Sequence, residues 1–209
     1  MKVNEIFYSI QGEGMLVGVP SIFLRLAGCN LRCSFCDTKY AYEQGTEMSI
    51  QEILDEIKKF TCNYVCLTGG EPLLQKDIIK LIESLLQKNY NVCLETNGSI
   101  SIKKLVGKKS LMISLDIKCP SSGFHKQMNM KNVSYLTKKD QLKFIIKNKD
   151  DYHYAKKILK KYHSPCTVFF QPVWGTNPKK LASWILKDGV NVRLALQLHK
   201  IVWGTKRGV

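Results

Sequence analysis

The chain has 209 residues, eight cysteines and a formal net charge of +15 at pH 7. Its length favours one domain over residues 1–209, large enough to bury a core without disulfides, and no apolar stretch approaches the roughly 18 residues of a membrane span. Because no signal-like apolar segment is present either, composition argues against a membrane protein and a disulfide-built secreted domain, and we expect a cytoplasmic protein with reduced thiols.

Strands and helices are predicted to alternate along the chain. Two strands, at 2–8 and 21–27, flank a glycine-rich loop, and a helix over 48–60 has Ser49 as its N-cap with Glu52 three residues on, a capping-box pattern. The remaining predicted elements are strand 64–68, helix 74–88, strands 91–95, 111–116 and 142–147, helix 150–162, strand 166–171, helix 178–187 and strand 190–197. This alternation predicts an α/β fold with a parallel sheet of about six strands, too few for a closed eight-stranded barrel.

Three cysteines, Cys29, Cys33 and Cys36, follow the second predicted strand with the spacing CxxxCxxC. Three thiolates on one short loop can each bind one iron of a cubane cluster and leave the fourth iron without a protein ligand. An open iron can bind a substrate or cofactor, so the spacing indicates chemistry rather than passive electron transfer. On spacing alone, a zinc site completed by a distant His, or simply reduced thiols, stays open as an alternative.

A second motif, Thr68-Gly69-Gly70-Glu71-Pro72, follows the next strand. Paired glycines let the backbone approach a ligand closely, and the proline ends the strand, although Gly-Gly alone is first of all a turn signal. With the cysteines upstream, and with Phe35 before the third of them, the chain resembles the radical S-adenosylmethionine (SAM) enzymes. That resemblance implies a partial, open β/α barrel with a [4Fe–4S] cluster and SAM at the carboxyl ends of its strands.

The other five cysteines mostly lie in or beside apolar strand patterns, where a free thiol behaves as a small hydrophobe. They are Cys62, Cys66, Cys93, Cys119 and Cys166. We interpret Cys66, in the run YVCLTGG, as a core residue.

Several further runs resemble the 7-carboxy-7-deazaguanine synthases within that superfamily. They are EIFYSIQGEG (5–14), GVPS (18–21), CDT (36–38), ETNG (95–98), DIK (116–118) and the closing QLHK and WGTKRGV, whereas the segment 120–165 carries almost no match. The resemblance implies conversion of 6-carboxy-5,6,7,8-tetrahydropterin to 7-carboxy-7-deazaguanine with release of ammonia, on the way to queuosine or archaeosine. A 5′-deoxyadenosyl radical would remove the C6 hydrogen before ring contraction. It also implies Mg²⁺, a homodimer, and a reductase such as flavodoxin or ferredoxin.

The same resemblance assigns roles to individual residues. Cys29, Cys33 and Cys36 would ligate the cluster, and Thr38 would bind Mg²⁺ through its hydroxyl. The SAM site would comprise Phe35, Cys36, Asp37, Gly70, Asp116, Ile117, Lys118, Gln171, Pro172, Val173 and Trp174. Asp116 and Ile117 stand where the family often has Ser and Pro, so only Lys118 matches there. The pterin would be held by Ile10, Gln11, Gly12, Glu13, Arg25, Thr68 and His199, and by the terminal carboxylate of Val209.

Each role has a structural alternative. Gln11 and Glu13 could be ordinary turn residues, although an amide and a carboxylate suit the donor-rich edge of a pterin. Arg25 could face solvent on a half-buried strand rather than aim its planar fork at a carboxylate. Thr38 could cap a turn, and His199 could be a surface residue on the predicted last strand.

Two other function classes compete with the pterin enzyme. A glycyl-radical activating enzyme shares CxxxCxxC but would not need the SIQGEG loop or CDT. A zinc- or iron–sulfur-containing tRNA partner would explain the positive charge but not the Gly-Gly-Glu-Pro motif. Since the lysines lack an aromatic platform for RNA, we interpret them as a solvated face and expect no direct nucleic-acid binding.

Overall fold

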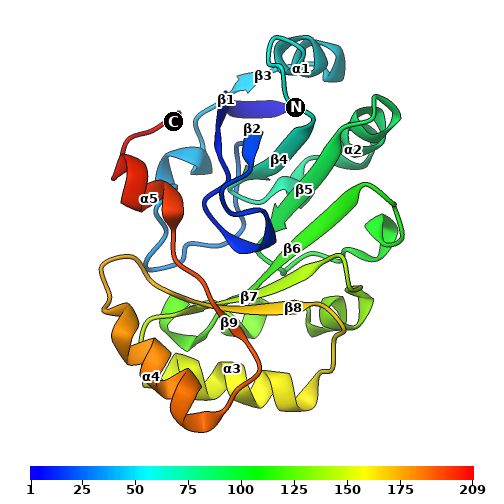
Figure 1. The fold of residues 1–209 in the computed structure, drawn as a ribbon. Helices are drawn as coiled ribbons and strands as arrows, with labels where there is room; N and C mark the ends of the chain where they lie inside the picture. The colour runs from blue at the N-terminus through cyan, green and yellow to red at the C-terminus, as the bar shows by residue number, and fades with distance from the viewer.

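A computed structural model describes all 209 residues and shows one curved, open sheet of nine strands in the order β3-β1-β2-β4-β5-β6-β7-β8-β9 (Figure 1). The strands are β1 (Lys2–Ile10), β2 (Pro20–Leu26), β3 (Thr46–Glu47), β4 (Tyr64–Gly69), β5 (Asn91–Thr96), β6 (Leu111–Ile117), β7 (Gln141–Ile146), β8 (Thr167–Pro172) and β9 (Arg193–Leu194). From β2 through β4 to β9 each neighbouring pair is parallel. The predicted α/β class and open barrel are confirmed.

The first strands depart from the parallel pattern, because β1 pairs antiparallel with both β2 and β3. Only residues 11–19 connect β1 to β2, and so short a connection cannot make the crossover that a parallel pair needs. The glycine-rich loop therefore turns back beside Pro20, at the end of β2 opposite to the one that leads into the cysteine motif.

Five helices accompany the sheet, and α2, α3 and α4 lie outside its curve in Figure 1. They are α1 (Ile50–Ile57), α2 (Ile78–Gln87), α3 (Lys149–Lys161), α4 (Pro178–Asp188) and α5 (Leu198–Trp203). Ser49 caps α1 as predicted, since its hydroxyl accepts from the amide of Glu52 and its own amide donates to the Glu52 carboxylate. None of these helices is long and apolar enough to cross a membrane.

Three predicted boundaries are wrong. The helix expected over 48–60 stops at Ile57, after which the amides of Lys59 and Phe60 bond three residues back in a tighter turn. The helix expected over 74–88 begins only at Ile78, after a separate 3₁₀ turn at Pro72–Leu74.

The third wrong boundary is the last strand, which was expected over 190–197 but spans only Arg193–Leu194. Leu194 and Leu196 are exposed, so no buried apolar face extends the strand. The amide of Leu198 instead donates to the carbonyl of Gly12, and the QLHK run enters α5. The chain end thus leaves the sheet and crosses toward the N-terminal loop.

The segment between β6 and β7, where the sequence carries little signal, contains no α-helix but three 3₁₀ turns. Fully buried Asn132 holds it in place: its amide nitrogen donates to the carbonyls of Gly98 and Ile100, and its oxygen accepts from the amide of Ile102. Asn132 therefore anchors a segment whose apolar side chains Met128, Val133 and Leu136 are buried in the core.

Candidate active site

A cavity of about 450 Å³ lies inside the curve of the sheet, lined by residues from β1 through β8 and from the chain end. Every site residue predicted from the sequence lines it except Ile117. Successive side chains of a strand point to opposite faces, so Asp116 faces the cavity while Ile117 is fully buried on the other side. Any contribution of Ile117 to the site is thus limited to its backbone.

The loop from Cys29 to Thr38, here called the cysteine loop, forms one wall. The thiols of Cys29, Cys33 and Cys36 are free and partly buried, and burial raises the pKa of the first two. Hydrogen bonds from backbone amides shape the loop, including those from the amide of Leu31 to the Cys29 sulfur (3.4 Å) and from the amide of Cys36 to the Cys33 carbonyl (3.1 Å). Three unpaired thiols facing one cavity form the soft donor set that an iron–sulfur cluster requires.

The end of β4 packs directly beneath this loop. A Cβ atom on Gly70 would lie 2.1 Å from the carbonyl oxygen of Gly28, so only glycine fits. The amides of Gly70 and Glu71 donate to the carbonyls of Leu26 (3.0 Å) and Gly28 (2.7 Å). The close approach expected of Gly-Gly is therefore used to seat the cysteine loop, and it leaves the strand end open to the cavity.

Glu71 has a structural role that its motif did not reveal. The side chain is fully buried, and burial raises its pKa, opposed by hydrogen bonds from the amides of Asn97 (2.6 Å) and Leu73 (3.0 Å) and the hydroxyl of Thr96 (2.9 Å). These bonds tie the Gly-Gly-Glu-Pro turn to the end of β5. The Gly-Gly-Glu-Pro turn and the end of β5 are thereby held in fixed positions at the cavity.

The base of the cavity carries a buried charge cluster, which we call the pocket floor: Glu13, Glu95, Asp116 and Lys143. The ammonium of Lys143, 4% exposed, lies 2.7 Å from Glu13, 3.0 Å from Glu95 and 3.3 Å from Asp116. Burial lowers the pKa of Lys143, but the three carboxylates together raise it well above its ordinary value. The lysine is therefore cationic at neutral pH.

The pKa values of the two glutamates of the floor are shifted in opposite directions. Burial raises the pKa of Glu13, but attraction to Lys143 and hydrogen bonds from Lys143 and Gln197 outweigh it, and the pKa falls to about 2. Burial also raises the pKa of Glu95. Attraction to Lys143 lowers this pKa, but repulsion from the carboxylates of Asp116 and Glu13 raises it again, and the net shift is upward. One floor carboxylate is thus firmly ionised while its neighbour is easier to protonate.

Lys143, Glu95 and Gln197 were not predicted as site residues. The interpretation of the lysines as a solvated face is wrong for Lys143, and the signal for its burial is that it is a single lysine inside the apolar run QLKFII. Gln197 donates to Glu13 Oε1 (2.8 Å), as does the predicted residue Gln171 (3.0 Å). Side chains from β7, β8 and the C-terminal segment thereby orient this one carboxylate.

The N-terminal loop and the chain end pack tightly together. A Cβ on Gly12 would fall 2.1 Å from Nδ1 of His199, so glycine is required there. Gln11 bonds backbone to backbone with Val19 (2.9 Å) and Gly18 (2.8 Å). His199 is half-buried and lines the cavity, so the alternative of a surface residue is wrong; burial lowers its pKa, opposed by Glu13.

The cavity wall also holds the residues expected to meet carboxylates and magnesium. Arg25 is 14% exposed and donates from Nε to Glu5 (2.6 Å), while its terminal nitrogens have no hydrogen-bond partner. The solvent-facing alternative for Arg25 is therefore wrong. The hydroxyl of Thr38 lies 3.7 Å from the sulfur of Cys36, and the terminal residue Val209 lines the same cavity.

The SAM-site residues of the sequence prediction, apart from Ile117, line the same cavity as the cysteine loop. Lys118 pairs with Asp116 at 2.8 Å, and Asp37 pairs with Lys200. Gln171 is 2% exposed, and its amide oxygen has no partner in the protein. An unpaired acceptor at this depth is costly unless a bound molecule donates to it, which fits a ligand-binding wall.

Comparison with known proteins agrees with this geometry. The model of the radical SAM superfamily matches residues 24–167. A 7-carboxy-7-deazaguanine synthase of Thermoplasma acidophilum is 41% identical over 209 residues, covering 100% of both chains, and one of Methanospirillum hungatei is 41% identical over 97% of this chain and 85% of its own. The crystal structure of QueE from Escherichia coli superposes with a TM-score of 0.78 over 95% of this chain and 94% of that one, at 23% identity.

Proposed function

The chain belongs to the 7-carboxy-7-deazaguanine synthase family of the radical SAM superfamily, and on that premise we propose how its cavity carries out the reaction. It is an enzyme that forms 7-carboxy-7-deazaguanine with a [4Fe–4S] cluster and SAM as cofactors. The substrate we propose is 6-carboxy-5,6,7,8-tetrahydropterin, which loses ammonia in the reaction. We further propose that residues 1–209 act as a single domain, in a reducing compartment where all eight thiols stay free.

Cys29, Cys33 and Cys36 would hold the cluster, leaving one iron for SAM. When bound, the cluster and SAM supply the one-electron chemistry that starts the reaction. Around them, the backbone at Gly70 and the side chains of Phe35 and Asp37 would position the methionine part of SAM. The end of β8, Gln171 to Trp174, would receive its nucleoside, for which the unpaired oxygen of Gln171 is a ready acceptor.

The pterin would lie between the N-terminal loop and the pocket floor. Glu13, kept ionised by Lys143, offers a carboxylate to the N–H donors of the pyrimidine ring. Gln11, Thr68, His199 and the terminal carboxylate would complete the polar contacts, with Gly12 and Ile10 shaping the surface against the ring. Since these groups are fixed by the protein before the substrate arrives, they fix the orientation of its C6.

The substrate carboxylate would meet the part of the cavity wall that carries Arg25 and Thr38. The terminal nitrogens of Arg25 are unengaged there, and the hydroxyl of Thr38 stands beside Cys36, where it would bind Mg²⁺. Mg²⁺ prefers oxygen ligands and keeps waters or substrate in its shell, so one protein hydroxyl suffices. The metal would then hold the carboxylate while the ring rearranges.

The observation that carries this proposal is the convergence of the cysteine loop, Thr38, Arg25 and Glu13 on one cavity. The test is anaerobic: the cluster is reconstituted, dithionite, SAM, Mg²⁺ and the pterin are added, and products are followed by mass spectrometry. We expect 7-carboxy-7-deazaguanine, dependent on all three cysteines of the loop. Release of 5′-deoxyadenosine without this product would support the assignment of the cofactors and contradict the assignment of the substrate.

Thr38 separates the pterin enzyme from a glycyl-radical activator. Thr38→Ala should abolish the stimulation of product formation by Mg²⁺, whereas Thr61→Ala, at an exposed position outside the cavity, should leave it intact. An unchanged Mg²⁺ response in Thr38→Ala would show that the Thr38 hydroxyl does not bind the metal.

A flavodoxin- or ferredoxin-type reductase would supply the electron, and we propose that the enzyme works as a homodimer.

A further inference from the structure

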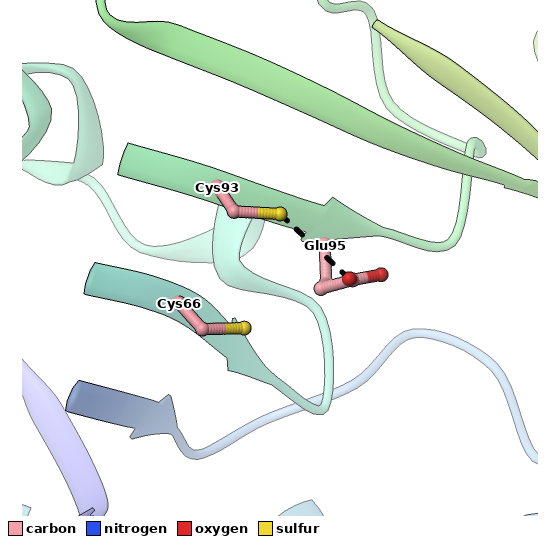
Figure 2. A group of neighbouring side chains, drawn as sticks. All are labelled: Cys66, Cys93 and Glu95. Carbon is pink, nitrogen blue, oxygen red and sulfur yellow. Dashed lines mark hydrogen bonds between the residues drawn. The ribbon is translucent and has the colours of Figure 1, made fainter. Parts of the chain in front are cut away.

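A group of metal-ligand side chains shares Glu95 with the pocket floor, and its two thiols have no part in the proposed reaction. Cys66 on β4 and Cys93 on β5 stand directly opposite each other in the parallel register, and Glu95 follows two residues along β5 on the same face. Figure 2 shows the three side chains extending from the two strands toward the same space. One ligand atom from each lies within 4.8 Å of the others.

The spacing of these atoms suits a small tetrahedral ion. Zinc–sulfur bonds of about 2.3 Å and zinc–oxygen bonds of about 2.0–2.2 Å place two such ligands roughly 3.5–3.8 Å apart. The Cys93 sulfur and Glu95 Oε1 are already 3.8 Å apart. An ion at the centre would thus need little rearrangement of either strand.

The sequence interpretation of Cys66 as a core residue describes its burial but not its contacts with the cavity. Cys66 and Cys93 are 2% and 3% exposed, as core thiols would be. Yet Cys66 also lines the cavity together with Glu95, and its sulfur accepts from the amide of Gln11 at 3.3 Å. The group is therefore polar on one side and reachable from the cavity, which leaves a fourth ligand position for water or for the amide oxygen of Gln11.

The charges around the group accommodate a divalent ion. Glu13, Glu95 and Asp116 face the ammonium groups of Lys143 and Lys118, so this buried region has one excess negative charge. A divalent cation that displaces both thiol protons leaves that balance unchanged. Hydrogen bonding to Cys66 and burial raise the pKa of Cys93, so metal binding releases protons and strengthens as pH rises.

We propose that Cys66, Cys93 and Glu95 form a binding site for a soft divalent metal ion of the zinc class, and that its occupancy inhibits the enzyme. Two thiolates select a thiophilic metal over Mg²⁺, so the site is separate in both place and chemistry from Thr38. Occupancy draws Glu95 away from Lys143 and breaks the bond between Cys66 and Gln11, which disturbs the pterin pocket. The inhibition rests on the proposed function, whereas the metal binding does not.

Binding is tested on the full chain carrying Cys29→Ser, Cys33→Ser and Cys36→Ser, which removes the competing thiols of the cysteine loop. Anaerobic titration with Cd²⁺ should give an ultraviolet thiolate-to-metal band that saturates at one ion per chain, and Zn²⁺ should displace it. Adding Cys93→Ser, a nearly isosteric change, should remove the band or weaken affinity by at least the tenfold or so typical of a disturbed metal site. Adding Cys166→Ser, at a buried thiol outside the group, should leave the band intact.

Inhibition is tested on the cluster-loaded enzyme. Zn²⁺ should inhibit product formation competitively with the pterin, and Cys93→Ser should keep its activity and lose this inhibition, while Cys166→Ser is inhibited like the parent. A Cd²⁺ band that survives Cys93→Ser, or equal inhibition of both variants, overturns the site. If no chain makes the product, the proposed function fails, and the Cd²⁺ titration still decides the metal site.

Discussion

The cysteine loop and the pocket floor face the same cavity but are built in opposite ways. The loop carries its three thiols within eight residues, Cys29 to Cys36, on a partly exposed segment without strands or helices. The floor brings together Glu13, Glu95, Asp116 and Lys143 from three strands and the N-terminal loop, all largely buried. The cysteine loop is thus built from neighbouring residues of the sequence, whereas the pocket floor depends on the arrangement of the whole sheet.

This difference predicts different costs when each is changed. A thiol on a loop contributes little to folding until a metal binds it. A buried ammonium is tolerated only because carboxylates surround it, and removing one partner leaves charge uncompensated in a poorly solvated place. The loop should therefore affect chemistry alone, and the floor both chemistry and stability.

The largest effect should follow Cys33→Ala, which removes one iron ligand. We expect product formation to fall to background, while the free energy of unfolding of the cluster-free chain changes by less than about 1 kcal/mol. Product analysis and urea denaturation measure the two quantities. Cys62→Ala, at a free thiol outside the cavity, is the matched control and should retain activity. Undiminished turnover by Cys33→Ala would exclude this loop from the cluster site.

Lys143→Met should act on both quantities. It leaves three carboxylates facing one another, so the free energy of unfolding should fall by about 3–5 kcal/mol, and product formation should be lost because Glu13 and Glu95 no longer hold their positions. Urea denaturation measures the first effect. Lys147→Met, at an exposed lysine just after β7, should change stability by no more than about 0.5 kcal/mol. Equal stability of the two variants would contradict the importance of the floor.

Glu13 should make stability depend on acid pH. Its pKa is about 2 in the folded chain against an ordinary 4.5, so its contribution is complete above pH 4.5 and is lost as pH falls from 4.5 to about 2. The full contribution is about 3 kcal/mol. Between about pH 6 and pH 3, the parent chain should lose more stability than Glu13→Gln. Parallel stability profiles for the two chains would show that Glu13 is not held ionised by Lys143.

The smallest effect should come from Ser49→Ala, which lies in neither region. Loss of the capping box of α1 should lower the free energy of unfolding by about 1 kcal/mol and leave turnover unchanged. Thermal denaturation and product analysis check this. A fall in turnover would mean that the stability of α1 affects the active site, which would contradict the assignment of activity to the cysteine loop and the pocket floor.

The parts of the protein with local geometry could be predicted from the amino-acid sequence alone. The cysteine spacing, the Gly-Gly-Glu-Pro turn, the Ser49 cap and the alternation of strands and helices all depend on residues a few positions apart, so their patterns could be interpreted directly. The residues expected at the site also gathered around one cavity, with the side chain of Ile117 as the exception.

Which distant residues contact one another became visible only in the folded chain. Lys143 looked like one more lysine until the sheet placed three carboxylates around it, and Cys66 looked like core until β5 brought Cys93 and Glu95 beside it. The chain end was expected to continue a strand, but its contacts with Gly12 turned it into α5. Such contacts depend on strand order and register between residues that lie from tens to more than a hundred positions apart, and no short-range pattern encodes them.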